Sequence, residues 1–165
     1  KEGKDNLTGV LKSCYRLFNE PVYSRVIGST KNEVYFQDFI SNNDCDIRVI
    51  VIGERAFAIK RLVREGDFRA SGSGNILYAK EHFDLSLIKC SLEYANRLGT
   101  QSCGFDYVFL DGIQKIVESS YGFATEGYID CVGFWDRDLV CYEKKFNSPN
   151  WMVDLVINEI KKKSE

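Results

Sequence analysis

Residues 104–120 read GFDYVFLDGIQKIVESS. Two mostly apolar runs, 105–110 and 113–117, flank the pair Asp111-Gly112. Asp-Gly between two such runs is typical of a tight turn, because both residues tolerate the left-handed backbone that a two-residue hairpin loop requires. The stretch therefore predicts a β-hairpin.

A second hairpin is predicted upstream of the first. Residues 46–52 and 56–63 are two β-rich runs, and the short segment Gly53-Glu54-Arg55 joins them. Residues 34–40 are expected to form a strand that runs into a connection. A polar, glycine-containing loop is expected over residues 64–74.

Three segments carry apolar residues at helical spacing. They are residues 6–19, residues 85–98 and a final segment from Val153 to Ile160, which is followed by Lys161, Lys162 and Lys163. Residues 121–150 are irregular and rich in aromatic and polar side chains. The order helix, strand, hairpin, helix, hairpin, helix predicts an α+β fold, an antiparallel sheet with helices packed on one face.

Composition narrows the function classes. The chain has 165 residues, of which 44% are hydrophobic, so a packed core is expected, and its net charge of −2 gives no reason to expect a nucleic-acid partner. It holds no apolar run of about 18 residues and no leader-like opening, so we expect no membrane span. Six cysteines without a Cys-x-x-Cys pair indicate reduced thiols in a cytoplasmic protein. The single histidine, His82, is expected at the surface.

Asp106 and Glu118 lie on the two strands of the hairpin in residues 104–120. A carboxylate on a strand that is otherwise apolar is costly to bury unless a cation or a base compensates it. Two carboxylates that converge make an oxygen-rich site suited to magnesium. The alternative is that one or both face solvent, and strand alternation alone does not decide between the two.

A set of basic residues surrounds the other hairpin and the loop after it: Arg48, Lys60, Arg61, Arg64 and Arg69. Guanidinium groups bind phosphate oxygens at two points, so cations at a strand end beside a flexible loop suit a phosphate clamp. The alternative is an ordinary charged surface. Residues 72–74, Gly-Ser-Gly, match neither the P-loop nor the dinucleotide fingerprint.

Four segments, taken together, resemble the ATP-grasp family. The similarity is closest to the branch that holds the ligase adding glutamate to a ribosomal protein and its glutathione-synthetase-like relatives. The four segments are QDFI at 37–40, DIRV at 46–49, REGDFRA at 64–70, and Asp106 with the run to Glu118, Ser119 and Ser120. They stand in the family's order, and the family's spacing between its Asp and its Glu is kept.

The resemblance implies a role for each matching residue. Gln37, Asp38, Phe39 and Ile40 would contact the adenine, and Asp46 would lie near the ribose. Arg61 and Arg69 would face phosphate or an acyl-phosphate. Asp106 and Glu118 would bind magnesium that bridges the ATP phosphates, with Ser120 as the third metal-binding residue where the family has Asn.

The resemblance also implies how the chain is divided. Residues 1–165 would be a single domain, the C-terminal portion of an ATP-grasp fold, with a lead-in helix in 1–33, the nucleotide- and metal-binding region in 34–120, and a variable region with a C-terminal helix in 121–165. Nothing in residues 1–33 matches the family's lysine-bearing strand and glycine-rich loop, so we expect the N-terminal part of the fold to be missing. The aromatic residues of 121–150 would either line an acceptor pocket or pack on the sheet as additional core.

The function that the resemblance implies is an ATP- and Mg-dependent ligase that joins a carboxylate to an amine or another nucleophile through an acyl-phosphate, incomplete as given. Its substrates would be small-molecule or peptide carboxylates and amines. The alternative is a degenerate ATP-grasp-like module that binds a nucleotide or a protein partner without catalysis. Ser71 and Ser120, which replace family residues, favour the module, whereas the carboxylates and arginines favour the ligase. Accidental motif matches in an unrelated α+β domain are the third hypothesis, and the oligomeric state is open.

Overall fold

The structure is a computed structural model that describes Leu11, Cys14, Tyr15, Asn19, Arg25, Val26, Gly28, Val34 and residues 36–164. The chain divides into two compact units, Lys1–Asp38 and Phe39–Glu165. The second unit carries the sheet. Most of the helix expected over residues 6–19 lies outside the described residues.

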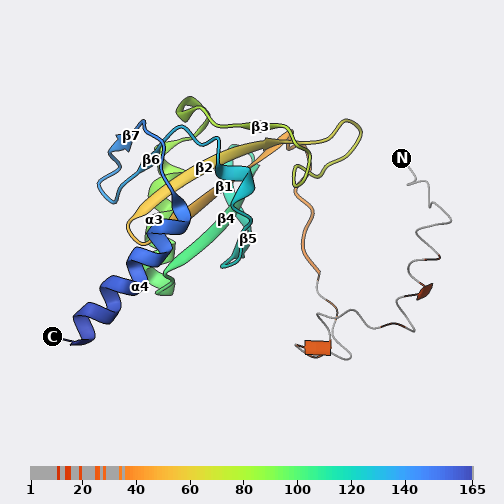
Figure 1. The fold of residues 1–165 in the computed structure, drawn as a ribbon. Coiled ribbons are helices and arrows are strands. Elements are labelled where there is room, and N and C mark those ends of the chain that lie inside the picture. Colours follow the sequence, from red (N-terminus) through yellow and green to blue (C-terminus); the bar gives the residue numbers. More distant parts are fainter. Residues whose placement is uncertain are drawn as a thin grey trace. The chain divides into compact units, whose positions relative to one another are not determined.

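The second unit is built around one antiparallel sheet (Figure 1). Its strands run in the order β5-β4-β1-β2-β6-β7, and β3 pairs with β2 beside this path. The elements in chain order are β1 (Cys45–Ile52), β2 (Arg55–Leu62), β3 (Ile76–Leu77), η1 (Lys80–His82), α3 (Leu85–Leu98), β4 (Ser102–Leu110), β5 (Ile113–Ser120), η2 (Glu126–Tyr128), β6 (Phe134–Trp135), β7 (Cys141–Tyr142) and α4 (Ser148–Ser164).

Both expected hairpins are present. β1 pairs with β2, and β4 pairs with β5 around Asp111 and Gly112, whose φ angles of 51° and 76° are both left-handed. This is the backbone that the Asp-Gly signal requires. The central pairing of β1 with β4 joins the two hairpins into one sheet.

Each face of the sheet has its own core. The odd-numbered residues of β1, such as Val49 and Val51, pack with Leu87 and Ile88 of α3. The even-numbered residues Ile50 and Ile52 pack on the opposite face, together with Leu155 of α4. Figure 1 shows α3 behind the sheet and α4 in front of it. The α+β fold is therefore confirmed, but α4 is not on the face that α3 covers, because the first turns of α4 cover the second apolar face.

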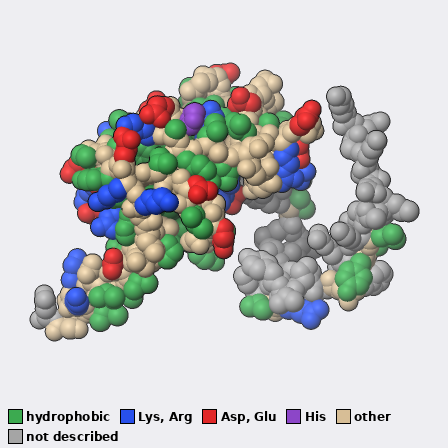
Figure 2. Space-filling view, turned by 45° about the horizontal axis from the view of Figure 1, so that its top comes forward, with side chains coloured by type: hydrophobic (Ala, Val, Ile, Leu, Met, Phe, Trp, Pro, Cys, Tyr) green, Lys and Arg blue, Asp and Glu red, His purple; other side chains and the backbone are tan. Residues whose placement is uncertain are grey.

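Helix α3 has the expected bounds because its ends are set by local chemistry. The side chain of Asp84 accepts a hydrogen bond from the Ser86 amide at the N-terminus, and Gly99 ends the helix in the left-handed conformation with φ 64°. His82, at the end of η1 just before this helix, is exposed as expected, and it is the purple side chain in Figure 2. Helix α4 begins earlier than the apolar spacing indicated, at Ser148.

The prediction of a strand over residues 34–40 is wrong for the residues that the structure describes. Residues 36–40 form neither helix nor strand, and Phe36 and Phe39 are exposed. The apolar residues of this segment have the composition of a strand, but composition alone does not make one.

The aromatic residues of the irregular region pack as core. Phe57, which is fully buried on β2, has ring contacts with Tyr128, Phe146 and Trp151 at centroid distances of 5.5, 4.9 and 6.2 Å. This packing fits the alternative in which the rings of residues 121–150 supply additional core. Among the described residues, no helix has the length and hydropathy needed to cross a bilayer.

Candidate functional site

Charged side chains gather on one face of the sheet, at the end where β1 begins. Strand register sets this placement, because residues directly opposite each other in an antiparallel pair point to the same face. Asp46 lies opposite Arg61, Arg48 lies opposite Asp106, and Asp106 lies opposite Glu118. These residues lie on the face that carries Ile50 and Phe57, away from α3.

Asp106 is held by two arginines. Arg48 donates from Nε to Asp106 Oδ1 and from Nη2 to Asp106 Oδ2, each at 2.5 Å. Arg61 donates from Nη2 to Asp106 Oδ2 at 2.9 Å. Arg61 also binds Asp46 at two points, each at 2.7 Å. The four residues Asp46, Arg48, Arg61 and Asp106 form one continuous ion-pair network, which we call the arginine–aspartate network.

The network is largely withdrawn from water. Arg61 is 6% exposed and Asp106 is 5% exposed. The hydrogen bond to Asp106 raises the pKa of Arg48. Burial lowers the pKa of Arg61, but the hydrogen bond to Asp46 and the charge of Asp106 outweigh it and raise the pKa overall. Two guanidinium groups and two carboxylates thus balance in charge, which is the condition under which buried ions are tolerated.

Tyr128 covers the network from the irregular region. Its ring is buried against Phe57, and burial raises the pKa of its phenol, while the hydrogen bond with Arg48 acts in the opposite direction. The sequence grouped Arg48 with the basic residues suited to a phosphate clamp and Tyr128 with the aromatic residues of 121–150, but it did not place either residue beside Asp106. Arg48 follows Asp46 by two positions on a strand, so the period of two was a signal for their shared face.

A β-bulge places Glu118 on this face. The register of β4 and β5 shifts between Asp106 and Tyr107, so that Tyr107 pairs with Ile116 but Asp106 pairs with Glu118. Regular pairing outward from the turn would instead set Val117 opposite Asp106. The additional residue therefore moves Glu118 to the face of Asp106, where it is exposed. Ser120 follows two positions later, and its hydroxyl donates to the Gly122 carbonyl at 2.7 Å.

These three residues have the donor chemistry that magnesium requires. Carboxylate and hydroxyl oxygens are hard ligands, and side chains directly opposite on neighbouring strands have Cβ atoms about 4.5–5.5 Å apart. In the described part of the chain, however, no three His, Cys, Asp or Glu side chains are grouped so as to hold a metal ion. Asp106, Glu118 and Ser120 therefore fit the ion by type and by face, with Asp106 already bound to guanidinium groups.

Arg69 lies in the loop that follows β2. It forms an ion pair with Asp67 at 2.7 Å, and its guanidinium carbon lies 5.9 Å from the centre of the Phe68 ring. The side chain of Arg69 is 62% exposed. The loop returns to the strand end, because the Arg64 amide donates to the Arg69 carbonyl. The loop after β2 thus begins beside Arg61, at the end of the sheet where β1 begins (Figure 1).

The segment expected at the adenine, residues 37–40, is divided between the two units. Phe39 and Ile40 belong to the second unit, whereas Gln37 and Asp38 belong to the first. Phe39 packs its ring edge-on against Phe68 at a centroid distance of 5.1 Å. Asn43 then fastens the segment to β4: its side chain donates to the Phe109 carbonyl at 3.0 Å and accepts from the Phe109 amide at 2.8 Å.

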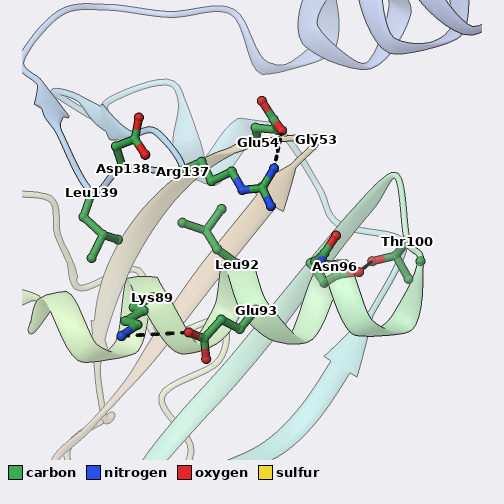
Figure 3. Close-up of a pocket in the computed structure, with 12 residues that line it drawn as sticks. Gly53, Glu54, Lys89, Leu92, Glu93, Asn96, Thr100, Arg137, Asp138 and Leu139 are labelled. Atoms are coloured by element: carbon green, nitrogen blue, oxygen red, sulfur yellow. Dashed lines mark hydrogen bonds and ion pairs between the residues drawn. The ribbon is translucent and has the colours of Figure 1, made fainter.

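A separate pocket of about 550 Å³ lies on the other side of the sheet (Figure 3). Helix α3, the turn between β1 and β2, and residues 137–139 line it. Four of its charged groups form two ion pairs, Arg137 with Glu54 at 3.0 Å and Lys89 with Glu93 at 4.0 Å. Because α3 packs on the face opposite Asp106, this pocket is distinct from the arginine–aspartate network.

The antiparallel sheet with helices packed on it fits an ATP-grasp domain. The sequence matches the RimK-like ATP-grasp domain over residues 19–120. The chain therefore belongs to this family, whose members are ATP-dependent ligases that act on carboxylate and amine substrates. A search of curated proteins found no match to the chain.

Proposed function

We propose that this chain carries the magnesium-binding carboxylates and one wall of the nucleotide site of an ATP-dependent carboxylate–amine ligase that works through an acyl-phosphate. The observation that supports it most directly is the register of β4 and β5, which sets Glu118 opposite Asp106 on the face that also carries Arg48 and Arg61. Carboxylates and guanidiniums on one face are the groups that phosphoryl transfer needs.

The proposed reaction has two steps. A substrate carboxylate oxygen attacks the γ-phosphorus of ATP, the bond from phosphorus to the β,γ-bridging oxygen breaks, and ADP leaves with that electron pair. An amine then attacks the carbonyl carbon of the acyl-phosphate, the carbon–oxygen bond breaks, and phosphate leaves as the nitrogen loses a proton. Neither step requires histidine or cysteine, because positioning and charge neutralisation supply most of the catalysis.

The roles proposed for the residues are those that the family resemblance implies. Arg61, held from two sides by Asp46 and Asp106, has a fixed orientation and would bind a phosphate oxygen. Arg69, on an exposed loop, would close over the phosphates. Phe39 and Ile40, with Gln37 and Asp38 before them, would contact the adenine, and Asp46 would lie on the ribose side.

Asp106, Glu118 and Ser120 would hold the magnesium ion. When bound, the ion supplies positive charge that neutralises the phosphate oxygens. Glu118 is exposed, and no ion pair of its own links it to another described residue. We therefore propose that Glu118 is the carboxylate that is open to the ion, with Asp106 opposite it.

The test is calorimetric titration of Mg²⁺ with a non-hydrolysable ATP analogue into the protein, together with a measurement of its ATP turnover. Glu118→Gln should abolish magnesium-dependent turnover and leave the thermal unfolding midpoint unchanged, because the side chain is exposed. Glu93→Gln on α3 is the matched control, since it makes the same change on an exposed residue far from this face. Turnover near the wild-type value in Glu118→Gln would remove Glu118 from the metal site.

A second candidate function has one observation in its favour. The two arginines already neutralise Asp106. A module that binds a nucleotide or a protein partner without catalysis needs no metal ion on this carboxylate, so it would tolerate these ion pairs. The same titration separates the two candidates. Binding of the nucleotide analogue that Asp106→Asn removes supports the ligase, whereas analogue binding that is independent of Mg²⁺ and of Asp106 supports the non-catalytic module.

A further inference from the structure

Guanidinium groups of two arginines bind Asp106 in this structure. The proposed function, on which this inference rests, would place a metal ion on the same carboxylate. Both carboxylate oxygens of Asp106 accept hydrogen bonds from guanidinium groups, with Arg48 on Oδ1 and both arginines on Oδ2. A cation bound to the same oxygens would stand beside two full positive charges. In a site as buried as this one, that repulsion is screened less than it would be at the surface.

Arg48 is better placed to leave Asp106 than Arg61 is. Arg61 is tied to Asp46 as well as to Asp106, and its side chain is 7% exposed. The only ion pair of Arg48 among the described residues is the one to Asp106, and its side chain is 18% exposed. Release of Arg48 therefore breaks one ion pair and its hydrogen bond with Tyr128, and it moves a side chain that already reaches solvent. Release of Arg61 would strand a second carboxylate.

We propose that Arg48 is a displaceable counter-ion for Asp106: it neutralises the carboxylate when no metal is bound and moves off it when the metal is bound. The freed guanidinium then lies on the same face as Glu118 without its carboxylate partner. A guanidinium in that state binds a phosphate oxygen readily, since a planar fork of donors matches phosphate geometry. Arg48 thereby couples occupation of the metal site to capture of the phosphates.

The coupling has a definite sign. Any anion that binds the freed Arg48 favours the metal-bound arrangement, and by linkage the metal favours anion binding to the same degree. Removal of the Arg48 charge should tighten Mg²⁺ binding, because the competitor for Asp106 is gone. It should at the same time weaken the binding of a phosphate-bearing ligand.

The first experiment follows the Arg48 and Arg61 Nε–H signals by ¹⁵N NMR while Mg²⁺ alone is added to the chain. We expect the Arg48 signal to shift and to exchange faster with water, and the Arg61 signal to move little because Asp46 still holds it. Asp106→Asn should remove the response of Arg48. Unchanged Arg48 signals at Mg²⁺ concentrations that shift the Glu118 carboxyl signal would overturn the proposal.

The second experiment measures Mg²⁺ affinity by calorimetry in Arg48→Gln, Arg48→Lys and Lys60→Gln. Couplings between sites are typically about 5–150-fold, so we expect Arg48→Gln to bind Mg²⁺ at least about fivefold more tightly than the wild type. Arg48→Lys, which retains the charge but not the two-point fork, should be intermediate. Lys60→Gln is the matched control, because it removes the same charge from β2 at a position paired with Ile47, on the face that α3 covers.

The outcomes separate this inference from the proposed function. Wild-type binding of Mg²⁺ and the ATP analogue, with the same Mg²⁺ affinity in Arg48→Gln as in Lys60→Gln, overturns the displacement of Arg48 and leaves the ligase proposal intact. Failure of the wild type to bind the ATP analogue counts against the ligase proposal alone. Failure of Arg48→Gln to take up Mg²⁺ overturns the displacement whatever the nucleotide result.

Discussion

Arg61 and Asp46 lie directly opposite each other on β2 and β1, and two hydrogen bonds of 2.7 Å join their side chains. The same guanidinium reaches diagonally to Asp106 on β4. One buried cation therefore ties the two hairpins together through their charged residues, in addition to the backbone pairing of β1 with β4.

Replacement of Arg61 by methionine should destabilise the fold strongly. The change leaves Asp46 without its ion pair and Asp106 with Arg48 alone, and the loss of one partner from a buried ion pair typically costs about 3–5 kcal/mol. Urea unfolding of Arg61→Met and of the wild type would measure the difference. A loss below about 1 kcal/mol, the range of surface ion pairs, would show that water reaches the network.

Substitution of Gly53 should cost more than substitution of Gly99. Both glycines have left-handed backbones, with φ of 59° and 64°, a conformation that costs an alanine about 1–2 kcal/mol. A Cβ on Gly53 would also lie 2.8 Å from Leu155 Cδ2, so that α4 or the Leu155 side chain must move, whereas a Cβ on Gly99 meets no atom within 4 Å. Thermal unfolding of Gly53→Ala and Gly99→Ala should therefore rank Gly53→Ala lower, and equal midpoints would contradict the contact with α4.

Stability should fall as pH rises above about 9, in part because of Cys131. Burial raises the pKa of this thiol from 9.0 to about 12. Between these values the unfolded chain loses the proton and the folded chain keeps it, so rising pH favours unfolding. One such group costs about 1 kcal/mol between pH 8 and pH 10. The difference in unfolding free energy between pH 8 and pH 10 should be smaller in Cys131→Ala, and an identical difference would exclude the thiol as its source.

Asp67 should titrate well below an ordinary aspartate. The hydrogen bond from Arg69 lowers the pKa of Asp67 from 3.8 to about 2. The ionised carboxylate of Asp67 stabilises the loop through its bond with Arg69. This stabilisation is therefore fully present above a pH of about 4 and is lost as the pH falls toward about 2. A ¹³C carboxyl titration should return the Asp67 midpoint toward 3.8 in Arg69→Gln. Arg64→Gln, which alters a bond to the Ser71 carbonyl in the same loop, should leave the midpoint unchanged.

The parts of the fold that the sequence predicted are those with a local cause. Asp111-Gly112 specifies its turn, and Asp84 and Gly99 set the two ends of α3. The two-residue strands β3 and β6 were not predicted, because each pairs with β2, which is distant in the sequence. Strand β7, which pairs with β6, was not predicted because two residues are too few to show an alternating pattern. Residues 36–40 are neither helix nor strand although Phe36, Phe39 and Ile40 are apolar, so composition alone was misleading there.

The candidate site shows a similar limit. Alternation outward from the Asp111-Gly112 turn would set Glu118 opposite Phe105, on the face that α3 covers. The register shift between Asp106 and Tyr107 places Glu118 opposite Asp106 instead, on the other face. No residue type in the strand indicates a bulge of this kind. The family resemblance, which carries the spacing of the two acidic residues, placed them together where strand alternation did not. The ion pairs that occupy Asp106 follow from three strands meeting, which a single sequence does not display.

Asn43 has a mechanical consequence for the nucleotide site as proposed. Its amide completes the ladder of β4 at Phe109, three residues from Asp106, and its backbone continues from Ile40 into β1. The segment that would contact the adenine and strand β4, which would carry the metal ligand Asp106, are thus joined by the side-chain amide of Asn43. A movement of either part would be transmitted to the other through these hydrogen bonds. A ligand that displaces Phe39 would therefore also displace β4, the strand of Asp106.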